Sequence, residues 1–208
     1  ELREGQICPV LLGSAARENG VLRLMKALRH EAPGIGATAK RLGVADSKEA
    51  LAYVFKTVHL QHGGKLSLAR VLTGRFDDGA AVLASSGAGG KISGILAATG
   101  AQETRRASAE AGEMIAFGKL DAVKTGDTLT TAKVAPPSLV SVAAAAPVLA
   151  IALAAGDRKD DVKLGQALAK LNEEDPSLAV VHNAQTHATA LWGQGEMHLP
   201  VALERLHD

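Results

Sequence analysis

The sequence is poor in the residues that several common functions require. It contains a single cysteine, Cys8, so an internal disulfide is impossible and the chain suits a reducing compartment. Aromatic residues make up 2% of the chain, too few to build a stacking platform for single-stranded bases. Lysine and arginine (23) nearly balance aspartate and glutamate (22), so we expect no DNA partner, and any RNA contact must come from a local basic patch.

Motifs for nucleotide hydrolysis and metal binding are also absent. The sequence has no G-x-x-x-x-G-K-[ST] phosphate loop and no Asn-Lys-x-Asp motif. The histidines that a zinc site would need are irregularly spaced, and cysteine adds nothing to them; they are His59, His62, His182, His187 and His198. We therefore assign no catalytic residues and no metal ligands to this chain.

A stretch without charged residues covers residues 134–156 and is long enough to cross a bilayer. Much of it is alanine, and Pro136, Pro137 and Pro147 divide it, which favours a linker followed by a buried strand over residues 148–154. The charged residues 1–4 do not begin a signal peptide. We expect a cytoplasmic protein with no membrane partner.

The first part of the chain, residues 1–33, has the pattern of one strand, a turn and a helix. Residues 7–12 form a short apolar run, and Asn19-Gly20 precedes a helical pattern of apolar residues that stops at Pro33-Gly34. This is a strand–helix remnant of an α/β domain. The glycine- and alanine-rich residues 34–48 that follow are typical of a linker.

Residues 49–135 change to a period of two, which indicates strands. Asp77-Asp78-Gly79 is a favourable hairpin turn between two of them. The expected strands cover residues 51–58, 66–73, 81–85, 91–97, 113–120 and 128–134. Short strands at this spacing with no helix between them predict a small antiparallel β-barrel.

Residues 136–208 follow the order strand, helix, strand, strand, helix. The elements are expected at residues 148–154, 161–171, 179–182, 187–192 and up to residue 206. One more strand would complete a β-α-β-β-α-β ferredoxin-like domain of the α+β class. The missing strand would pair beside residues 148–154, so we expect a bare apolar edge there and concentration-dependent association of the chain.

Two polar stretches of this last part stand where local physics disfavours them. Glu173, Glu174 and Asp175 crowd the negative end of a helix dipole, and Pro176 ends that helix. A solvated acidic helix end is the simplest explanation. Catalysis is not indicated either, because Glu173 and Glu174 are adjacent in sequence and do not face each other as a general acid and base. The second stretch, residues 193–199, places two glycines before a helix, in a turn that suits either a bound anion or the close approach of another backbone.

Together these stretches resemble the third domain of the elongation factor G family of translational GTPases. The resemblance rests on Glu-Glu-Asp-Pro at residues 173–176 and on Gly-x-Gly-Glu-x-His-Leu at residues 193–199. Residues 55–56, 64–71, 111–113 and 124–129 resemble that family's barrel domain in matching order, and residues 9–15 resemble the last guanine-nucleotide motif of its GTPase domain. Met197 and Pro200 depart from the family pattern.

The resemblance implies a fragment of a ribosome-dependent GTPase that moves tRNA and mRNA. GTP and Mg²⁺ would be bound by the complete protein and not by this fragment, although Ser14 and Ala15 would meet the guanine. The candidate interface to the ribosome and to the chain's own GTPase domain consists of Glu173, Glu174, Asp175, Gly193, Gly195, Glu196 and His198. The candidates for ribosomal RNA contacts are Lys65, Arg70, Arg75 and Lys91.

Two alternatives to an elongation role remain open at this point. The first is a divergent paralogue that acts in ribosome recycling or in ribosome protection against an antibiotic. The second is a stand-alone ribosome- or RNA-binding module without a GTPase. The residues that would discriminate between paralogues are not in this sequence.

Overall fold

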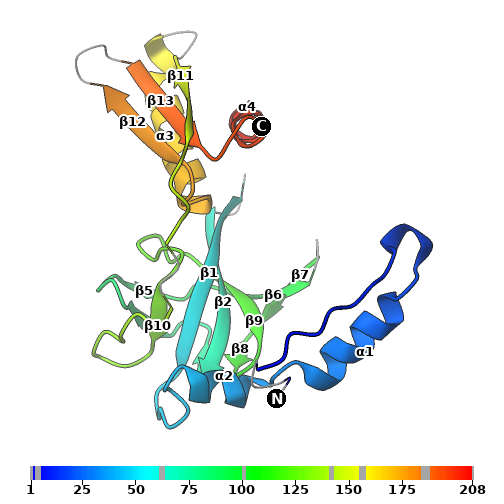
Figure 1. The fold of residues 1–208 in the computed structure, drawn as a ribbon. Coiled ribbons are helices and arrows are strands. Elements are labelled where there is room, and N and C mark those ends of the chain that lie inside the picture. The colour runs from blue at the N-terminus through cyan, green and yellow to red at the C-terminus, as the bar shows by residue number, and fades with distance from the viewer. Residues whose placement is uncertain are drawn as a thin grey trace. The chain divides into compact units, whose positions relative to one another are not determined.

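The computed structural model describes residues 2, 6–60, 64–99, 102–140, 143–154, 158–183 and 188–207 (Figure 1). The chain divides into two compact units, Glu1–Lys48 and Glu49–Asp208. No helix among the described residues is long and apolar enough to span a membrane.

The first unit contains a 3-10 turn, Ala15–Arg17, and the helices α1 (Val21–Glu31) and α2 (Ile35–Arg41). Helix α1 begins at the predicted place: Gly20 is its N-cap with φ +79°, and a side chain there would collide with the carbonyl oxygen of Leu12. The expected strand over residues 7–12 is not formed, because no strand of the described chain pairs with it. The expected linker contains α2, since alanine, lysine and arginine favour a helix and Gly36 costs only about 1 kcal/mol.

The second unit begins with the antiparallel barrel domain. Its strands are β1 (Leu51–Leu60), β2 (Gly64–Thr73), β3 (Arg75–Asp77), β4 (Ala81–Ala84), β5 (Gly89–Lys91), β6 (Ile95–Thr99), β7 (Gln102–Arg106), β8 (Ser108–Glu110), β9 (Met114–Gly118) and β10 (Thr128–Thr130). Eight of them form one sheet in the order β5-β4-β10-β1-β2-β9-β6-β7, and β3 pairs with β8. The predicted mixed fold class, led by an antiparallel β domain, is confirmed.

The turn at Asp77-Asp78-Gly79 is present but does not form a hairpin. The N–H of Ala80 donates to the carbonyl oxygen of Asp77 at 3.1 Å, yet β3 pairs with β8 while β4 pairs with β10 and β5. Strands β7 and β8 were not predicted, because their charged residues lack an apolar alternation. Turn chemistry therefore marks where the chain reverses, but not which strand it pairs with.

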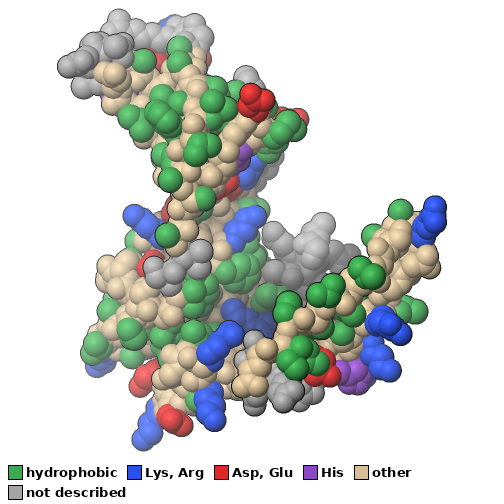
Figure 2. All heavy atoms as spheres, in the orientation of Figure 1, with side chains coloured by type: hydrophobic (Ala, Val, Ile, Leu, Met, Phe, Trp, Pro, Cys, Tyr) green, Lys and Arg blue, Asp and Glu red, His purple; other side chains and the backbone are tan. Residues whose placement is uncertain are grey.

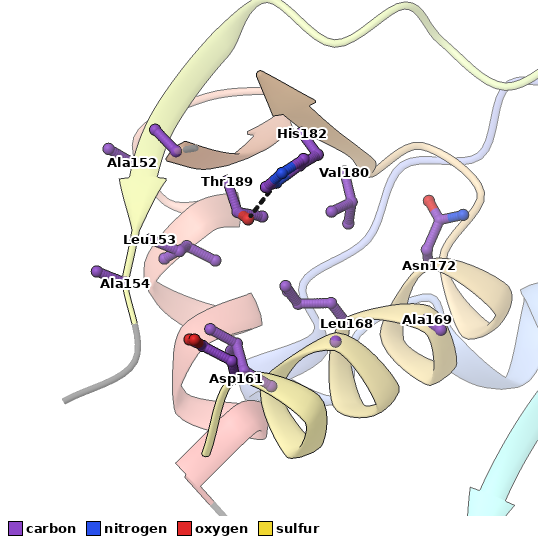
Figure 3. A pocket seen from close by; sticks show the side chains of 13 residues that line it. Ala152, Leu153, Ala154, Asp161, Leu168, Ala169, Asn172, Val180, His182 and Thr189 are labelled. Carbon is purple, nitrogen blue, oxygen red and sulfur yellow. Dashed lines mark hydrogen bonds between the residues drawn. The ribbon is translucent and has the colours of Figure 1, made fainter. Parts of the chain in front are cut away.

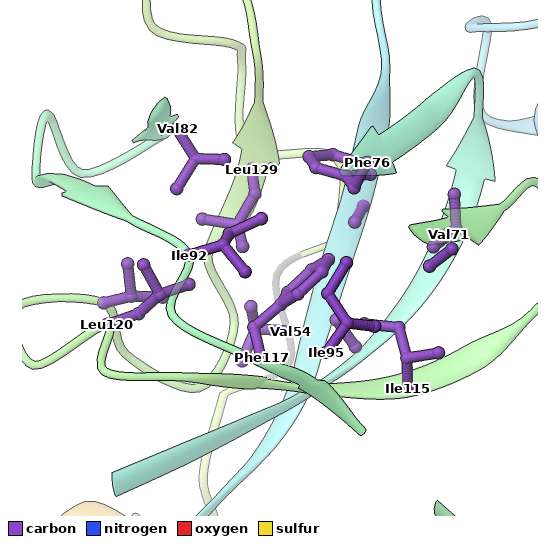
Figure 4. Packing of buried hydrophobic residues seen from close by; sticks show 14 of the residues in the cluster. Val54, Val71, Phe76, Val82, Ile92, Ile95, Ile115, Phe117, Leu120 and Leu129 are labelled. Carbon is purple, nitrogen blue, oxygen red and sulfur yellow. The ribbon is translucent and has the colours of Figure 1, made fainter. Parts of the chain in front are cut away.

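Two phenylalanines lie in the middle of the barrel core (Figure 4). Phe76 and Phe117 are fully buried, with ring centroids 5.3 Å apart and an interplanar angle of 53°. Ile92, Ile95 and Leu129 belong to the same cluster, so strands far apart in sequence meet at these rings.

The third domain contains β11 (Leu149–Leu153), a 3-10 turn (Arg158–Asp160), α3 (Asp161–Glu174), β12 (Ala179–Asn183), β13 (Ala188–Gly193) and α4 (His198–His207). Its antiparallel sheet has the order β11-β13-β12 (Figure 1). The two helices pack on one core with β13, built from Leu168, Leu171, Leu178, Leu191, Leu199 and Ala202. This is the predicted ferredoxin-like order. β11 lies at the edge of the described sheet and its residues are exposed or half-buried, so the expectation of a buried strand over residues 148–154 is wrong.

Truncation of a ring in the barrel core should destabilise the second unit. We expect Phe117→Ala to lower the free energy of unfolding by about 3–5 kcal/mol, because the cavity it leaves lies among fully buried side chains. Phe55→Ala is the matched control, since Phe55 is 42% exposed and should cost well under half as much. Urea denaturation measures both; equal losses would contradict this account of the core.

Candidate functional site

The acidic end of α3 contacts the barrel through Glu173. Its Oε2 lies 2.7 Å from Nε2 of His59, and its Oε1 accepts a hydrogen bond from the Lys65 ammonium. His59 and Lys65 are directly opposite each other in the β1–β2 ladder, so their side chains reach one carboxylate together. Strands β1 and β2 of the barrel therefore bind the last turn of α3 in the third domain.

Lys65 is the most deeply placed charge of this contact. It is 4% exposed, and its Nζ also donates to the carbonyl oxygens of Asp121, at 2.8 Å, and Val123. An ammonium has three protons, and these three acceptors use all of them. In this arrangement all three protons of Lys65 are used within the protein, and an RNA contact at this residue stays a prediction.

Glu174 joins three elements. Its Oε1 accepts a hydrogen bond from the backbone N–H of His59 in β1, and its Oε2 pairs with the Arg205 guanidinium in α4. The Glu174 side chain is 7% exposed, so these bonds are shielded from water on the carboxylate side. We call the contacts among His59, Lys65, Glu173, Glu174 and Arg205 the acidic joint.

Asp175 connects the first polar stretch to the second. The backbone N–H of Gln194 donates to Nδ1 of His198 at 3.0 Å, so the proton of the neutral imidazole lies on Nε2. That Nε2 is 2.9 Å from Oδ2 of Asp175, whose Oδ1 accepts from the N–H and hydroxyl of Ser177 at 3.0 and 2.6 Å. The structure thus brings the two predicted stretches together through one histidine.

The glycine turn before α4 serves close packing. A side chain at Gly193 would stand 2.9 Å from Leu199 and 3.1 Å from Nδ1 of His198. The N–H groups of His198 and Leu199 donate to the carbonyl oxygen of Gly195 at 3.2 and 3.3 Å, so the turn closes on itself. The close neighbours of Gly193 are thus the side chains of His198 and Leu199 and not another backbone, and a bound anion at this turn stays a prediction. Glu196 is exposed and has no hydrogen-bond or ion-pair partner among the described residues.

These partners remove the conflict with the helix dipole. Three carboxylates at the C-terminus of α3 would be unfavourable alone, but Lys65 and Arg205 supply positive charge beside them. Burial raises the pKa of Glu173, but the hydrogen bonds and charge of Lys65 and His59 outweigh it and hold that pKa below its ordinary value. Burial likewise raises the pKa of Asp175, and its bonds from Ser177 and His198 bring it lower overall.

The remaining RNA candidates do not form one patch with Lys65. Arg75 is tied to Asp77 at 2.8 Å, Arg70 is half-buried on β2, and Lys91 is exposed at the end of β5. RNA contacts at these three residues stay predictions.

Ser14 and Ala15, the predicted guanine contacts, lie in the first unit. The N–H of Ser14 donates to the carbonyl oxygen of Asn19 at 2.9 Å, and Ala15 begins the 3-10 turn. Their assignment as cofactor residues stays a prediction. No group of three potential metal ligands occurs among the described residues, and His62 and His187 lie outside them.

A cavity of about 1250 Å³ lies between α3 and the sheet of the third domain (Figure 3). Leu153, Leu168 and Val180 give it apolar walls. On its sheet side, Nδ1 of His182 in β12 lies 3.2 Å from the hydroxyl of Thr189 in β13. The cavity contains none of the residues of the acidic joint.

Comparison with known proteins agrees with this architecture. Residues 49–132 match the family model described as elongation factor G domain 2, and residues 144–208 match elongation factor G, domain III. The chain belongs to the elongation factor G family. An elongation factor G-like protein of Synechocystis sp. is 43% identical over 208 residues, which cover 99% of this chain and 30% of that protein. A crystal structure from Thermus thermophilus superposes with a TM-score of 0.76 at 30% identity, covering 94% of this chain and 29% of that one.

In elongation factor G terms, the acidic joint connects domain 2 to domain III. The chain spans about 30% of the length of the relative and of the solved structure. Two residues of the joint, His59 and Arg205, were not predicted from the sequence. No local pattern marks them, since each meets Glu173 or Glu174 only through the fold.

Neutralising Glu173 should weaken the joint in a pH-dependent way. At neutral pH we expect Glu173→Gln to cost about 1 kcal/mol, because Lys65 keeps a neutral acceptor in place of a charged one. The folded-state pKa of Glu173 lies below its ordinary 4.5, so the charged joint stabilises fully above pH 4.5 and loses this contribution as pH falls through the lower folded value. The gap between wild type and variant should therefore shrink on acidification, as measured by urea denaturation.

Glu196→Gln is the control for this experiment. It removes the same charge from an exposed side chain without a partner among the described residues, so it should change the free energy of unfolding by less than about 0.5 kcal/mol at every pH. A gap for Glu173→Gln that widens toward acid pH would contradict the assignment.

Proposed function

We propose that this chain supplies the second and third domains of a ribosome-dependent translational GTPase that promotes movement of tRNA and mRNA. The acidic joint is the observation that carries the proposal. It connects two domains through the bonds of His59 and Lys65 to Glu173 and Glu174, which suits a factor that must transmit a change of state from one domain to the next. The site of such work is the ribosome, in the cytoplasm.

The chemistry of GTP hydrolysis would lie outside the residues described above. A GTPase needs a phosphate loop and Mg²⁺ to hold the β- and γ-phosphates, and this sequence has no phosphate-loop motif. GTP and Mg²⁺ would therefore be bound by the GTPase domain of a longer protein of the kind that the relative represents. Ser14 and Ala15 would contribute backbone contacts to the guanine there.

The joint has features that suit coupling. A buried ion pair contributes little net stability compared with apolar packing, but it fixes a specific arrangement, and breaking one partner leaves the other uncompensated. Lys65 on β2 is 4% exposed and the Glu173 side chain on α3 is 26% exposed, so their pairing favours one register of the two domains at this contact. A movement of either domain would therefore be transmitted to the other through this contact.

The coupling is tested in the complete protein with the double variant Lys65→Met, Glu173→Gln. Removal of both charges deletes the pair without leaving one charge uncompensated, and circular dichroism checks that the fold is kept although Asp121 and Val123 lose the Lys65 donor. We expect ribosome-stimulated GTP turnover to fall about tenfold, equivalent to about 1.4 kcal/mol, with turnover in the absence of ribosomes unchanged.

Lys163→Met is the control for the coupling test, because it removes the exposed pair with Asp160 on the same helix. It should leave both rates unchanged. If the double variant matches wild type with ribosomes present, the joint has no role in coupling.

The RNA contacts are tested separately by Arg70→Gln and Lys91→Gln in the complete protein. Each phosphate contact that is lost should lower the slope of log affinity for ribosomes against log salt by about one. Arg75→Gln is the comparison, because Arg75 is already paired with Asp77. Ribosome binding measured over a salt series distinguishes these outcomes, and unchanged slopes for Arg70 and Lys91 would remove them as RNA contacts.

A further inference from the structure

A hollow of about 430 Å³ lies in the surface of the barrel domain and shares no lining residue with the acidic joint. Its lining comes from three segments of the chain: the turn before β4, the end of β5 with the residues after it, and the residue after β9. The lining residues are Asp78, Gly79, Lys91, Ile92, Ser93 and Lys119. We call this the lysine hollow.

Backbone hydrogen bonds hold the three segments together. The N–H of Gly79 donates to the carbonyl oxygen of Ile92 at 3.1 Å, and the N–H of Ser93 donates to that of Gly118 at 3.1 Å. Ile92 is 1% exposed and belongs to the barrel core, so the middle segment is anchored there. A side chain at Gly118 would stand 2.7 Å from the carbonyl oxygen of Ser93, so glycine is needed for this approach. The lysine hollow is therefore a fixed feature of the barrel.

The lysine hollow carries two free lysines. Lys91 and Lys119 are exposed, and neither has a hydrogen-bond or ion-pair partner among the residues that the structure describes. A Cβ at Gly79 would lie 3.8 Å from Cε of Lys91, so the end of this side chain lies beside the turn that forms one wall. The Ser93 hydroxyl is likewise without a partner in the described part of the chain. Ammonium and hydroxyl groups are the donors that phosphate oxygens accept.

Lys119 has a backbone conformation that lysine rarely adopts. Its φ is 58°, in the left-handed region where glycine is favoured. The barrel holds it there, since its N–H donates to the carbonyl oxygen of Lys65 at 3.3 Å. Strained residues cluster at binding sites, where the surrounding structure maintains them. A glycine would avoid the strain, so the lysine is present at a cost to stability, which supports a role for its side chain.

One carboxylate also lines the lysine hollow, but it is already paired. Oδ1 of Asp78 accepts a hydrogen bond from the N–H of Gly94 at 2.8 Å, and Oδ2 lies 3.0 Å from the Arg105 guanidinium. Arg105 offsets the charge of Asp78, so the hollow keeps the positive charges of Lys91 and Lys119. An anion bound between the two lysines would therefore meet no unpaired carboxylate of the lining residues.

We propose that Lys91, Lys119 and the Ser93 hydroxyl bind one compact phosphate dianion, such as inorganic phosphate or the phosphate group of a monoester. The two ammonium charges balance the two charges of such a group, and a hollow of this volume lies in the range of small-ligand sites. Such a site would operate in the barrel domain alone, and it does not depend on the proposed function.

An RNA strand fits the lysine hollow less well. Its phosphates carry one charge each and follow one another along a chain, which calls for a row of basic residues. The visible face of the barrel in Figure 2 carries Lys and Arg side chains in separate groups. None of the described residues that line the hollow is aromatic and able to stack a base, and the exposed Asp121 follows two residues after Lys119. These features favour a small dianion over a polyanionic chain.

The site is tested by titrating the 208-residue chain with inorganic phosphate at constant ionic strength while its amide resonances are followed by NMR. We expect saturable shifts at Gly79, Ser93 and Lys119. Lys91→Gln and Lys119→Gln should each weaken phosphate binding on the order of fivefold, because each removes one charged donor group.

Lys133→Gln is the matched control for these two variants. Lys133 is an exposed lysine of the same domain, has no partner among the described residues and does not line the hollow, so its replacement should leave the phosphate affinity unchanged. Shifts that sodium chloride reproduces overturn the proposal, and so does an equal loss of affinity in all three variants.

The class of ligand is tested with three further probes. Ribose 5-phosphate carries a monoester dianion and should bind as inorganic phosphate does, whereas dimethyl phosphate, a diester with one charge, should bind roughly fivefold more weakly. A hexauridylate without terminal phosphates carries diester groups alone. Binding of this RNA at the same amides, tighter than that of phosphate, would overturn the dianion and assign the lysine hollow to RNA.

Lys119→Gly separates ligand binding from folding. It relieves the left-handed strain, so the urea midpoint should be unchanged or higher, whereas the phosphate affinity should fall as in Lys119→Gln. An affinity equal to that of wild type in Lys119→Gly would contradict the role given to this lysine.

Discussion

The buried pairing of Lys65 with Glu173 is the constraint on which the arrangement of this chain depends. An ammonium that is 4% exposed must keep all its acceptors, or its burial becomes strongly unfavourable. Two of those acceptors are carbonyl groups of the barrel, and the third is the carboxylate at the end of α3. The acids at that helix end would be unfavourable in an isolated third domain, because of its dipole. The Glu173 carboxylate compensates the buried charge of Lys65, and Lys65 offsets the repulsion between the acids and the negative end of the α3 dipole.

The same pairing gives the acidic stretch a structural role. Glu173, Glu174 and Asp175 look like an acidic cluster in sequence, but they have separate partners. Glu173 contacts β1 and β2, Glu174 contacts β1 and Arg205 of α4, and Asp175 contacts His198 at the start of α4. Their lone pairs are used by lysine, arginine, histidine, serine and backbone donors. The cluster therefore connects the barrel to the third domain, and α3 to α4.

Local patterns in the sequence predicted the elements well where periodicity is strong. The helix of leucines in α3 and the alternating strands β1 and β2 are found close to their expected ranges. Pairing was less predictable: the turn at Asp77-Asp78-Gly79 has good chemistry but leads into a different sheet. The site shows the same limit, because Lys65 has the appearance of a solvated strand residue until Asp121 and Val123 fold over it. In each case the sequence did not predict a contact between residues far apart in the chain, because no pattern among neighbouring residues indicates it.

The burial of Lys65 has a consequence for its chemical reactivity. A lysine must present an unprotonated amine to be acetylated, methylated or labelled, and here all three protons are held by acceptors in a nearly closed site. While domain 2 and domain III stay joined, this side chain is shielded from modifying enzymes and amine-reactive reagents. We expect its reactivity to rise when the end of α3 moves away, because the Glu173 carboxylate then no longer covers it. The reactivity of the Lys65 amine would therefore depend on whether domain 2 and domain III are in contact.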